Sequence, residues 1–477
     1  METTTHPMRM PRERWRPKPA GYSSSSSNNN SNSNNNISNN SNSNNNKNND
    51  SNTDPTWPPS AAAVGEASAE RRVQEVSAHV ARPSEIKTSL GKPVVVVWFR
   101  WSDLRLHDHE PLVQAHERAR QIGGQVLHLH VIERGLLAGR SRVGGVPRCG
   151  ARRALFWREA VLDLAASLKE RGQLLHVCSD NNSNSNSNSN SNSSTNNGIA
   201  EVFRDLCKRF PVSAVFAHRE LCHEELQTEE LVRRTLAQQS VGLETFWGGL
   251  TVHHIDDLGF DAKDRRQMPG LYQPFLKAVR SRPVRRPLAE PNFAPPPLGL
   301  SEDLPVEAVV EAIFALPGAP PAWQPPGPGM GIDVFADWKG GETSALAYLQ
   351  RYVWTDDKLK VVYEVRQYEK ARGKSKSSYW VYHELIFRDF FRFTVPLWGK
   401  TLFSLNGPYD VTKLRWIRDQ DLFDRWREGK TGYPFVDAGM RELAATGTIS
   451  HLHRQCCAAF LVRDLRLDWR LGAEHFE

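Results

Sequence analysis

The sequence predicts an N-terminal α/β domain with a doubly wound parallel sheet, followed by an all-α C-terminal domain. Three observations predict this architecture. Residues 93–247 alternate short apolar runs with helical patterns, which is the rhythm of parallel α/β sheets. A Pro-rich stretch follows at 282–329, and beyond it the strand signal fades. The length of 477 residues allows about two or three domains at about 100–200 residues each.

The first strand is predicted at residues 94–98, because this run is continuously apolar and β-branched, as in a strand covered on both faces. A helix is predicted at 152–171, where Trp157, Val161, Leu164 and Leu168 fall on one side and Gly172 follows as a C-cap. Further strands are expected at 174–178, 214–217 and 244–247, and further helices at 200–209 and 224–239.

The second half shows only helical patterns. Gly447 is a plausible stop between the last two of them. Helices are predicted at 342–352, 378–394, 419–428, 437–446 and 451–465.

Composition excludes several classes of protein. No apolar run approaches the roughly 18–20 residues of a membrane helix, so we expect no membrane partner. The six Cys show no CxxC spacing, which argues against a structural zinc site. Neither a GxGxxG nor a P-loop sequence is present. The net charge of +7 permits a phosphate-bearing partner, although solubility alone explains it.

Two Ser/Asn tracts bury no apolar surface and are predicted to be disordered. Residues 1–21 are rich in Arg, so they are either a plain tail or an organelle transit peptide; chloroplast, mitochondrion, nucleus and cytoplasm all stay open. The expected organisation is a disordered tail (1–92), the α/β domain (93–260) with a disordered insert (181–197), a Pro-rich connector (261–335) and the helical domain (336–477).

The predicted helix at 378–394 carries the most informative pattern. Trp380, Glu384, Phe387, Arg388 and Phe391 share one face by their i, i+3, i+4, i+7 spacing. Such a face suits a pocket in which rings stack on a planar ligand while the charged groups bond its polar edges. The alternative is a Glu384–Arg388 ion pair on a solvated face.

Two further sets of residues are open to more than one interpretation. Trp416 and Trp469 are either ordinary core aromatics or redox-active rings beside a planar cofactor. His451 and His453 lie close to Cys456 and Cys457, but residues at i and i+2 face different sides of a helix. We therefore expect no metal there, and interpret these side chains as surface or cofactor-facing groups.

Six sequence blocks carry a resemblance to a known family. The blocks are WFRWSDLRLHDHEPL (98–112), AHRELCHEE (217–225), FWGGLTVHHIDDL (246–258), YWVYHELIFRDFFRF (379–393), KTGYPFVDAGMRELAATG (430–447) and FLVRDLRLDWRLGAEHFE (460–477). They resemble the photolyase/cryptochrome family and follow in the family's order. The wording of several, especially RDFFRF and DWRLGAE, resembles its cryptochrome DASH branch.

The resemblance implies an FAD-binding-type helical domain and, less directly, a 5,10-methenyltetrahydrofolate antenna. It implies a deoxyribodipyrimidine photo-lyase, in which light-excited reduced FAD splits cyclobutane pyrimidine dimers, preferably in single-stranded DNA. RNA is a second candidate partner, and we expect a monomer. The alternatives are a non-enzymatic blue-light photoreceptor or nucleic-acid-binding regulator, and an inactive truncated member.

The resemblance also carries residue roles onto the predicted helix 378–394. It implies that Glu384 hydrogen-bonds the dimer bases and that Phe387 stacks on them, where the family usually has Trp or Tyr. It places Arg388 between flavin and DNA, and Trp380 against the cofactor.

Elsewhere the resemblance matches Trp469 and Trp416 to the middle and outer members of the family's tryptophan relay. It places Arg454 beside the flavin and His451 among the cofactor-binding residues, where the family has Asn. Glu220, in the block at 217–225, is the implied antenna contact.

Departures from the family pattern fall on the flavin site. Judged against the resemblance, we expect the loop that wraps the FAD phosphates to be missing between Trp354 and Tyr368, and the family's last flavin segment to be missing after Glu477. Such a pocket loses charge-assisted bonds worth about 1.5–3 kcal/mol each. We therefore expect this polypeptide to bind FAD weakly or not at all.

Overall fold

The computed structural model describes residues 91–180, 197–297, 305–316, 318–322, 338–351, 370, 373, 376–411 and 415–477. All but the last two residues of the predicted N-terminal tail (1–92) and all but the last residue of the predicted insert (181–197) lie outside the described residues. So does the interval between Trp354 and Tyr368, where the phosphate loop is predicted to be missing.

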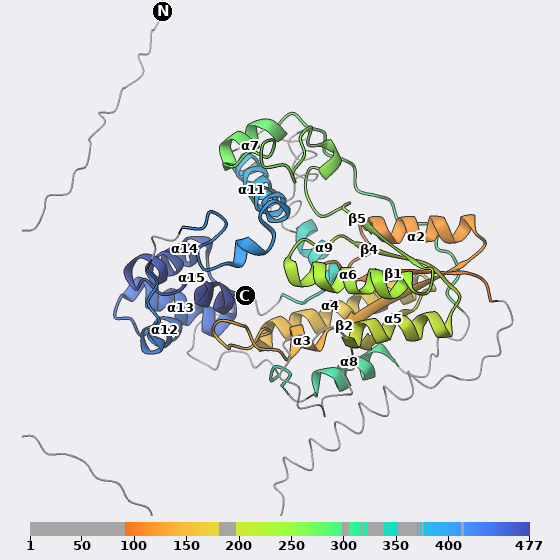
Figure 1. The fold of residues 1–477 in the computed structure, drawn as a ribbon, viewed down its shortest axis with the longest axis horizontal. Coiled ribbons are helices and arrows are strands. Elements are labelled where there is room, and N and C mark those ends of the chain that lie inside the picture. Colours follow the sequence, from red (N-terminus) through yellow and green to blue (C-terminus); the bar gives the residue numbers. More distant parts are fainter. Residues whose placement is uncertain are drawn as a thin grey trace, which may run out of the picture. The chain divides into compact units, whose positions relative to one another are not determined.

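The N-terminal domain is built on one parallel sheet of five strands (Figure 1). Its order is β3-β2-β1-β4-β5, and every neighbouring pair is parallel. The strands are β1 (Val94–Phe99), β2 (Gln125–Ile132), β3 (Leu175–Ser179), β4 (Val212–His218) and β5 (Gly242–Phe246). The chain winds outward from β1 in one direction and then returns to place β4 on its other side. The predicted doubly wound sheet is therefore confirmed.

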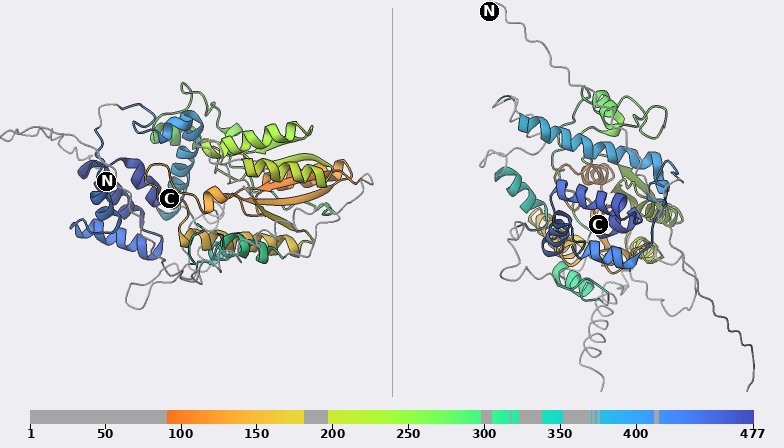
Figure 2. Two further views of the ribbon diagram at one scale, coloured as in Figure 1. Left: turned by 60° about the horizontal axis from the view of Figure 1, so that its bottom comes forward. Right: turned by 90° about the vertical axis from the view of Figure 1, so that its left-hand side faces the viewer.

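Helices cover both faces of this sheet (Figure 2). Val95, Val97 and Phe99 of β1 point into one core, while Val94, Val96 and Trp98 point into the other. This explains why all six residues of β1 are apolar and buried. The first core is completed by α2 (Glu110–Gln121), α4 (Ala151–Glu170) and α8 (Val306–Phe314), and the second by α5 (Asn197–Arg209) and α6 (His223–Ala237).

The segment predicted as a Pro-rich connector, 261–335, contains two helices that the sequence pattern did not predict. It contains α7 (Tyr272–Val279) and α8, and Val309, Val310 and Ile313 of α8 are buried in the first core. Prolines flank α8 but lie outside it, and Pro305 stands at its N-cap. The helix α8 was not predicted because the prolines around it led us to interpret the whole segment as a linker.

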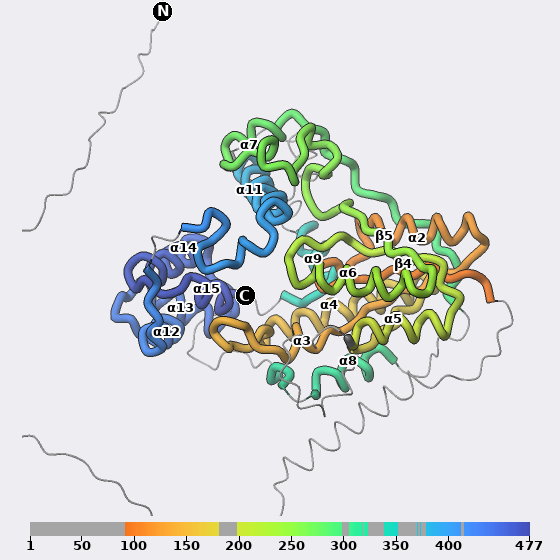
Figure 3. Tube along the Cα trace, viewed as in Figure 1, coloured from red at the N-terminus to blue at the C-terminus, as the bar shows by residue number. Residues whose placement is uncertain are grey.

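The second half is all-α in its described residues, as predicted. Helix α7 packs against the long α11, and the chain trace shows the two side by side (Figure 3). The predicted helix at 451–465 is instead α14 followed by one π-helical turn at Phe460–Asp464. The helices are α9 (Glu342–Gln350), α11 (Lys376–Trp398), α12 (Gln420–Arg427), α13 (Pro434–Thr446), α14 (His451–Ala459) and α15 (Trp469–Phe476). No helix in the described part of the chain is long and apolar enough to span a bilayer.

Candidate functional site

Helix α11 presents a mixed aromatic and charged face to solvent. The Trp380 side chain is 55% exposed, Phe391 is 54% exposed, and the Arg388 side chain is 54% exposed. Glu384 is also exposed, and Phe387 is half-buried. The structure therefore brings these five residues onto one face, as their spacing predicts. We call this set the α11 face.

The opposite side of α11 fixes the direction of this face. Ile386, Phe390 and Phe393 are buried in a core shared with Phe275 of α7. The Phe393 ring stacks on Trp247, with centroids 5.4 Å apart and planes at 14°. Because this side is anchored by apolar burial, α11 cannot turn its charged face inward without losing that core.

Phe387 lies at the border between the α11 face and the core. Its ring meets Tyr272 at 4.7 Å and Phe391 at 4.9 Å, both in T-shaped geometry. The Tyr272 hydroxyl donates to the His383 carbonyl at 2.9 Å. Burial raises the pKa of Tyr272 to about 12. Phe387 is therefore held by neighbouring rings, while part of its surface stays accessible.

Arg388 pairs with its neighbour in the sequence. Its Nε and Nη2 donate to Asp389 Oδ1 at 3.0 and 2.6 Å. Among the described ion pairs, Arg388 is joined to Asp389 rather than to Glu384, so the alternative of a Glu384–Arg388 pair is not observed. Burial raises the pKa of Asp389, while the Arg388 guanidinium acts in the opposite direction.

The C-terminal candidates form a second group. His451 and Arg454 are exposed on α14, whereas Trp416 and Trp469 are half-buried. The Trp469 indole donates to the Leu405 carbonyl at 3.1 Å. None of the described hydrogen bonds, ion pairs or ring contacts joins this group to the α11 face. The structure thus brings together the predicted residues of the α11 face, but not the C-terminal candidates with them.

Glu220 lies elsewhere, beyond the carboxyl end of β4, in a partly buried charged cluster. Its carboxylate is 4.0 Å from Arg100 Nε, and that of Glu133 is 4.0 Å from Arg100 Nη2. Burial raises the pKa of Glu220 to about 7, against the opposing charge of Arg100. Both distances exceed a hydrogen bond. Nε and Nη1 of Arg100, whose side chain is 2% exposed, have no hydrogen-bond partner among the described residues.

Sequence reasoning missed Arg100 and Glu133 as candidates. A signal was available, because each directly follows a strand, β1 or β2. In an open parallel sheet, ligands bind outside the carboxyl ends of the strands, where the strand order reverses. Here the order reverses between β1 and β4, which is where Arg100 and Glu220 lie.

Comparisons with known proteins agree with this fold. A family profile described as "DNA photolyase" matches residues 95–294, and one described as "FAD binding domain of DNA photolyase" matches 380–477. These matches and the fold define a photolyase-type protein with an α/β domain and a helical FAD-binding domain. The chain belongs to the photolyase/cryptochrome family.

Its relatives include proteins named cryptochrome DASH. The chain is 33% identical over 444 residues to "Cryptochrome DASH, chloroplastic/mitochondrial" of Oryza sativa subsp. japonica, covering 82% of this chain and 69% of the relative. It is 33% identical over 418 residues to "Cryptochrome DASH" of Xenopus laevis, covering 80% of this chain and 72% of the relative. The crystal structure of a Synechocystis cryptochrome superposes with a TM-score of 0.67 at 30% identity, covering 82% of this chain and 79% of that chain.

Proposed function

We propose that this protein is a blue-light-driven flavoprotein of the cryptochrome DASH type, and that its α11 face binds single-stranded or damaged DNA. The observation that carries the proposal is the exposure of Trp380, Glu384 and Arg388 on one side of a helix whose other side is locked in a core. A solvated face does not need exposed large rings, whereas a surface that binds splayed bases does.

Each side chain of the α11 face suits a different part of a nucleotide. Aromatic rings such as Trp380 and Phe387 stack on bases without strong sequence preference. The Glu384 carboxylate accepts hydrogen bonds from base N–H groups, and a guanidinium binds phosphate. A single strand offers bases that are already unstacked, so it lowers the cost of bringing a lesion to this face.

FAD is the implied cofactor of the helical half. The described residues fit its chemistry in part: Arg454 and Arg388 offer exposed guanidiniums for anionic groups, and Trp380 offers an exposed ring. Reduced FAD, when bound, supplies the electron that splits a cyclobutane dimer. The chain's own part is to hold the dimer with Glu384 and Phe387, while Trp416 and Trp469 are the proposed relay residues.

The Arg100 cluster supports a folate-type antenna. A pterin ring carries N–H donors beside a carbonyl acceptor. Glu220 and Glu133 can accept from such donors, and the unpartnered Arg100 nitrogens can donate to such an acceptor. Buried guanidinium nitrogens without hydrogen-bond partners, such as Nε and Nη1 of Arg100, are costly, so a ligand that supplies the missing acceptor is favoured.

A second candidate function is a non-enzymatic photoreceptor or nucleic-acid-binding regulator. It is favoured by Phe387, a smaller ring than Trp that also packs on Tyr272, and by the loop proposed to be missing between Trp354 and Tyr368. This candidate predicts salt-dependent DNA or RNA binding without lesion turnover.

Lesion turnover in the light and in darkness separates the two functions. The protein is supplied with excess FAD, reduced, and mixed with single-stranded DNA carrying a thymine dimer. The proposed function predicts loss of the dimer under blue light only. Tight binding with no turnover in the light favours the regulator, and equal loss in darkness excludes photochemistry.

A further inference from the structure

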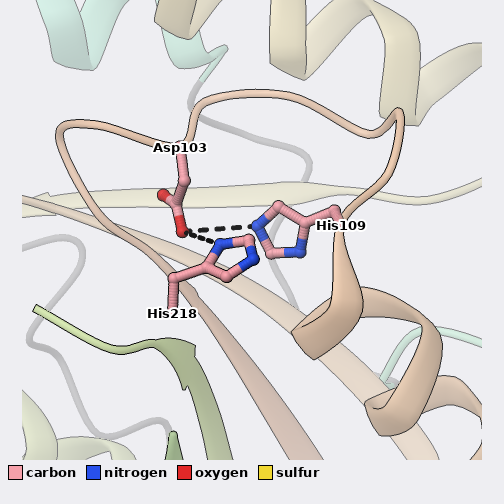
Figure 4. Close-up of side chains that lie close together, drawn as sticks. All are labelled: Asp103, His109 and His218. Atoms are coloured by element: carbon pink, nitrogen blue, oxygen red, sulfur yellow. Dashed lines mark hydrogen bonds and ion pairs between the residues drawn. The ribbon is translucent and has the colours of Figure 1, made fainter. Parts of the chain in front are cut away.

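A buried cluster that the proposed chemistry does not use lies at the ends of β1, β4 and β5. Asp103, His109 and His218 place three potential metal-ligand atoms within 4.8 Å of one another (Figure 4). Their side chains are at most 2% exposed. Residue types and spacing alone would suggest a metal site, so the hydrogen bonds of each ring nitrogen decide the question.

His109 has no lone pair to offer a metal in the cluster. Its Nδ1 accepts the Leu112 backbone N–H at 3.1 Å, which caps the first turn of α2. The proton of the neutral ring must therefore be on Nε2, which lies 3.4 Å from Asp103 Oδ2. Burial, with the charge of His218 next in size, lowers the pKa of His109 to about 3, so this ring is neutral.

His218 faces an acceptor on each side. Its Nδ1 is 2.8 Å from Asp103 Oδ2, and its Nε2 is 2.8 Å from the Gly248 carbonyl. A carbonyl oxygen can only accept, so Nε2 carries a proton. Asp103 also accepts the Arg100 backbone N–H through Oδ1 at 2.5 Å. Burial by itself would raise the pKa of Asp103, but the two neighbouring histidines, His218 by a hydrogen bond and His109 at 3.4 Å, hold it well below its usual range.

We infer that His218 carries protons on both ring nitrogens and forms a buried ion pair with ionised Asp103, closed to metals. This couple joins the turn after β1 to the last residue of β4, and so positions Arg100, which follows β1, and Glu220, which follows β4. The charged groups around the couple are Arg100, Arg105, Glu110 and Glu220. Asp103 and His218 are thus positioning residues for the candidate antenna site, a role that rests on the proposed function.

The protonation state is tested by imidazole ¹H–¹⁵N correlation spectra of the full chain at pH 7, with the His218 signals assigned by their loss in His218→Gln. We expect two protonated ring nitrogens in the wild type and one, Nε2, in Asp103→Asn. A singly protonated His218 in the wild type would overturn the ion pair. So would stoichiometric Zn²⁺ binding that is lost in Asp103→Asn. The wild-type spectrum decides whether the ion pair forms, even if Asp103→Asn fails to fold.

The positioning role is tested separately, by titrating methenyltetrahydrofolate into the same proteins. Asp103→Asn should weaken binding about tenfold, as expected when a charged hydrogen bond is lost. Asp205→Asn, an exposed carboxylate paired with Lys208, is the matched control and should bind as the wild type does. Equal affinity in Asp103→Asn overturns the positioning role. Absence of binding to the wild type refutes the antenna, and the spectra then judge the ion pair by themselves.

Discussion

The carboxylate of Asp389, in the middle of α11, accepts the backbone N–H of Val252 at 2.6 Å, although the two residues are 137 positions apart. The same side chain holds Arg388 through its other oxygen. Asp389 therefore links the α11 face to the loop that follows the sheet, and it sets the orientation of one of the proposed DNA contacts.

Asp389→Ala should lower the free energy of unfolding by about 1–3 kcal/mol, because the partly buried Val252 N–H loses its acceptor. Urea unfolding followed by circular dichroism measures the change. Glu384→Ala is the control, since this exposed residue on the same helix should change stability by no more than about 0.5 kcal/mol. Equal stability of Asp389→Ala and the wild type would show that this bond does not anchor α11.

Trp380→Ala should weaken binding of single-stranded DNA, because a base stacked on an aromatic ring contributes about 1–3 kcal/mol. Fluorescence anisotropy with a labelled oligonucleotide at fixed salt gives the change in Kd. Trp338→Ala is the matched control: Trp338 is 48% exposed, similar to Trp380, but lies outside the α11 face. If both variants lose affinity equally, the α11 face is not the binding surface.

Glu220 should make stability depend on pH. Burial raises its folded pKa from 4.5 to about 7, so the folded state holds a proton that the unfolded state has released. Stability should therefore fall as pH rises from about 4.5 to 7, by up to roughly 3 kcal/mol from this group, and level off above it.

Glu220→Gln should flatten this slope, because the amide does not titrate. Urea midpoints at pH 5, 6, 7 and 8 measure it, and Glu230→Gln, an exposed carboxylate on α6, provides the comparison. A wild-type slope that survives in Glu220→Gln would assign the dependence to another group, such as Asp180, whose pKa burial also raises to about 7.

The purified chain should carry far less than one flavin per protein. This expectation rests on our proposal that the phosphate-binding loop implied by the family resemblance is missing between Trp354 and Tyr368. Backbone N–H groups at helix starts are what hold a diphosphate. Absorbance near 450 nm after gel filtration measures bound flavin. A stoichiometric flavin band would contradict the expectation.

Local pattern predicted the α11 face because its five residues lie within one helix, where 3.6-residue periodicity fixes which side chains are neighbours. The same reasoning predicted β1 and α4. It did not find β2, because His128 and His130 interrupt its apolar run, yet both are fully buried. His128 is accommodated by the His116 ring at 3.1 Å, and His130 by the Phe99 carbonyl at 3.0 Å.

The Asp103–His218 pair could not be predicted from spacing, since its members are 115 residues apart and meet only because β1 and β4 are adjacent. The same holds for the contact between Asp389 and Val252. Periodicity identifies the faces of single elements, whereas sites at the carboxyl ends of strands depend on strand order. Predicting such sites therefore requires the order of the strands in the sheet, which local sequence pattern does not contain.

The most direct test of the proposed function is lesion loss under blue light by wild type and Glu384→Gln. Both proteins receive excess reduced FAD and the same single-stranded DNA carrying one thymine dimer. We predict light-dependent repair by the wild type and a rate lower by about tenfold or more in Glu384→Gln, because a carboxylate accepts a stronger hydrogen bond than an amide. Equal rates in the two proteins, or no light-dependent repair by the wild type, would contradict the account.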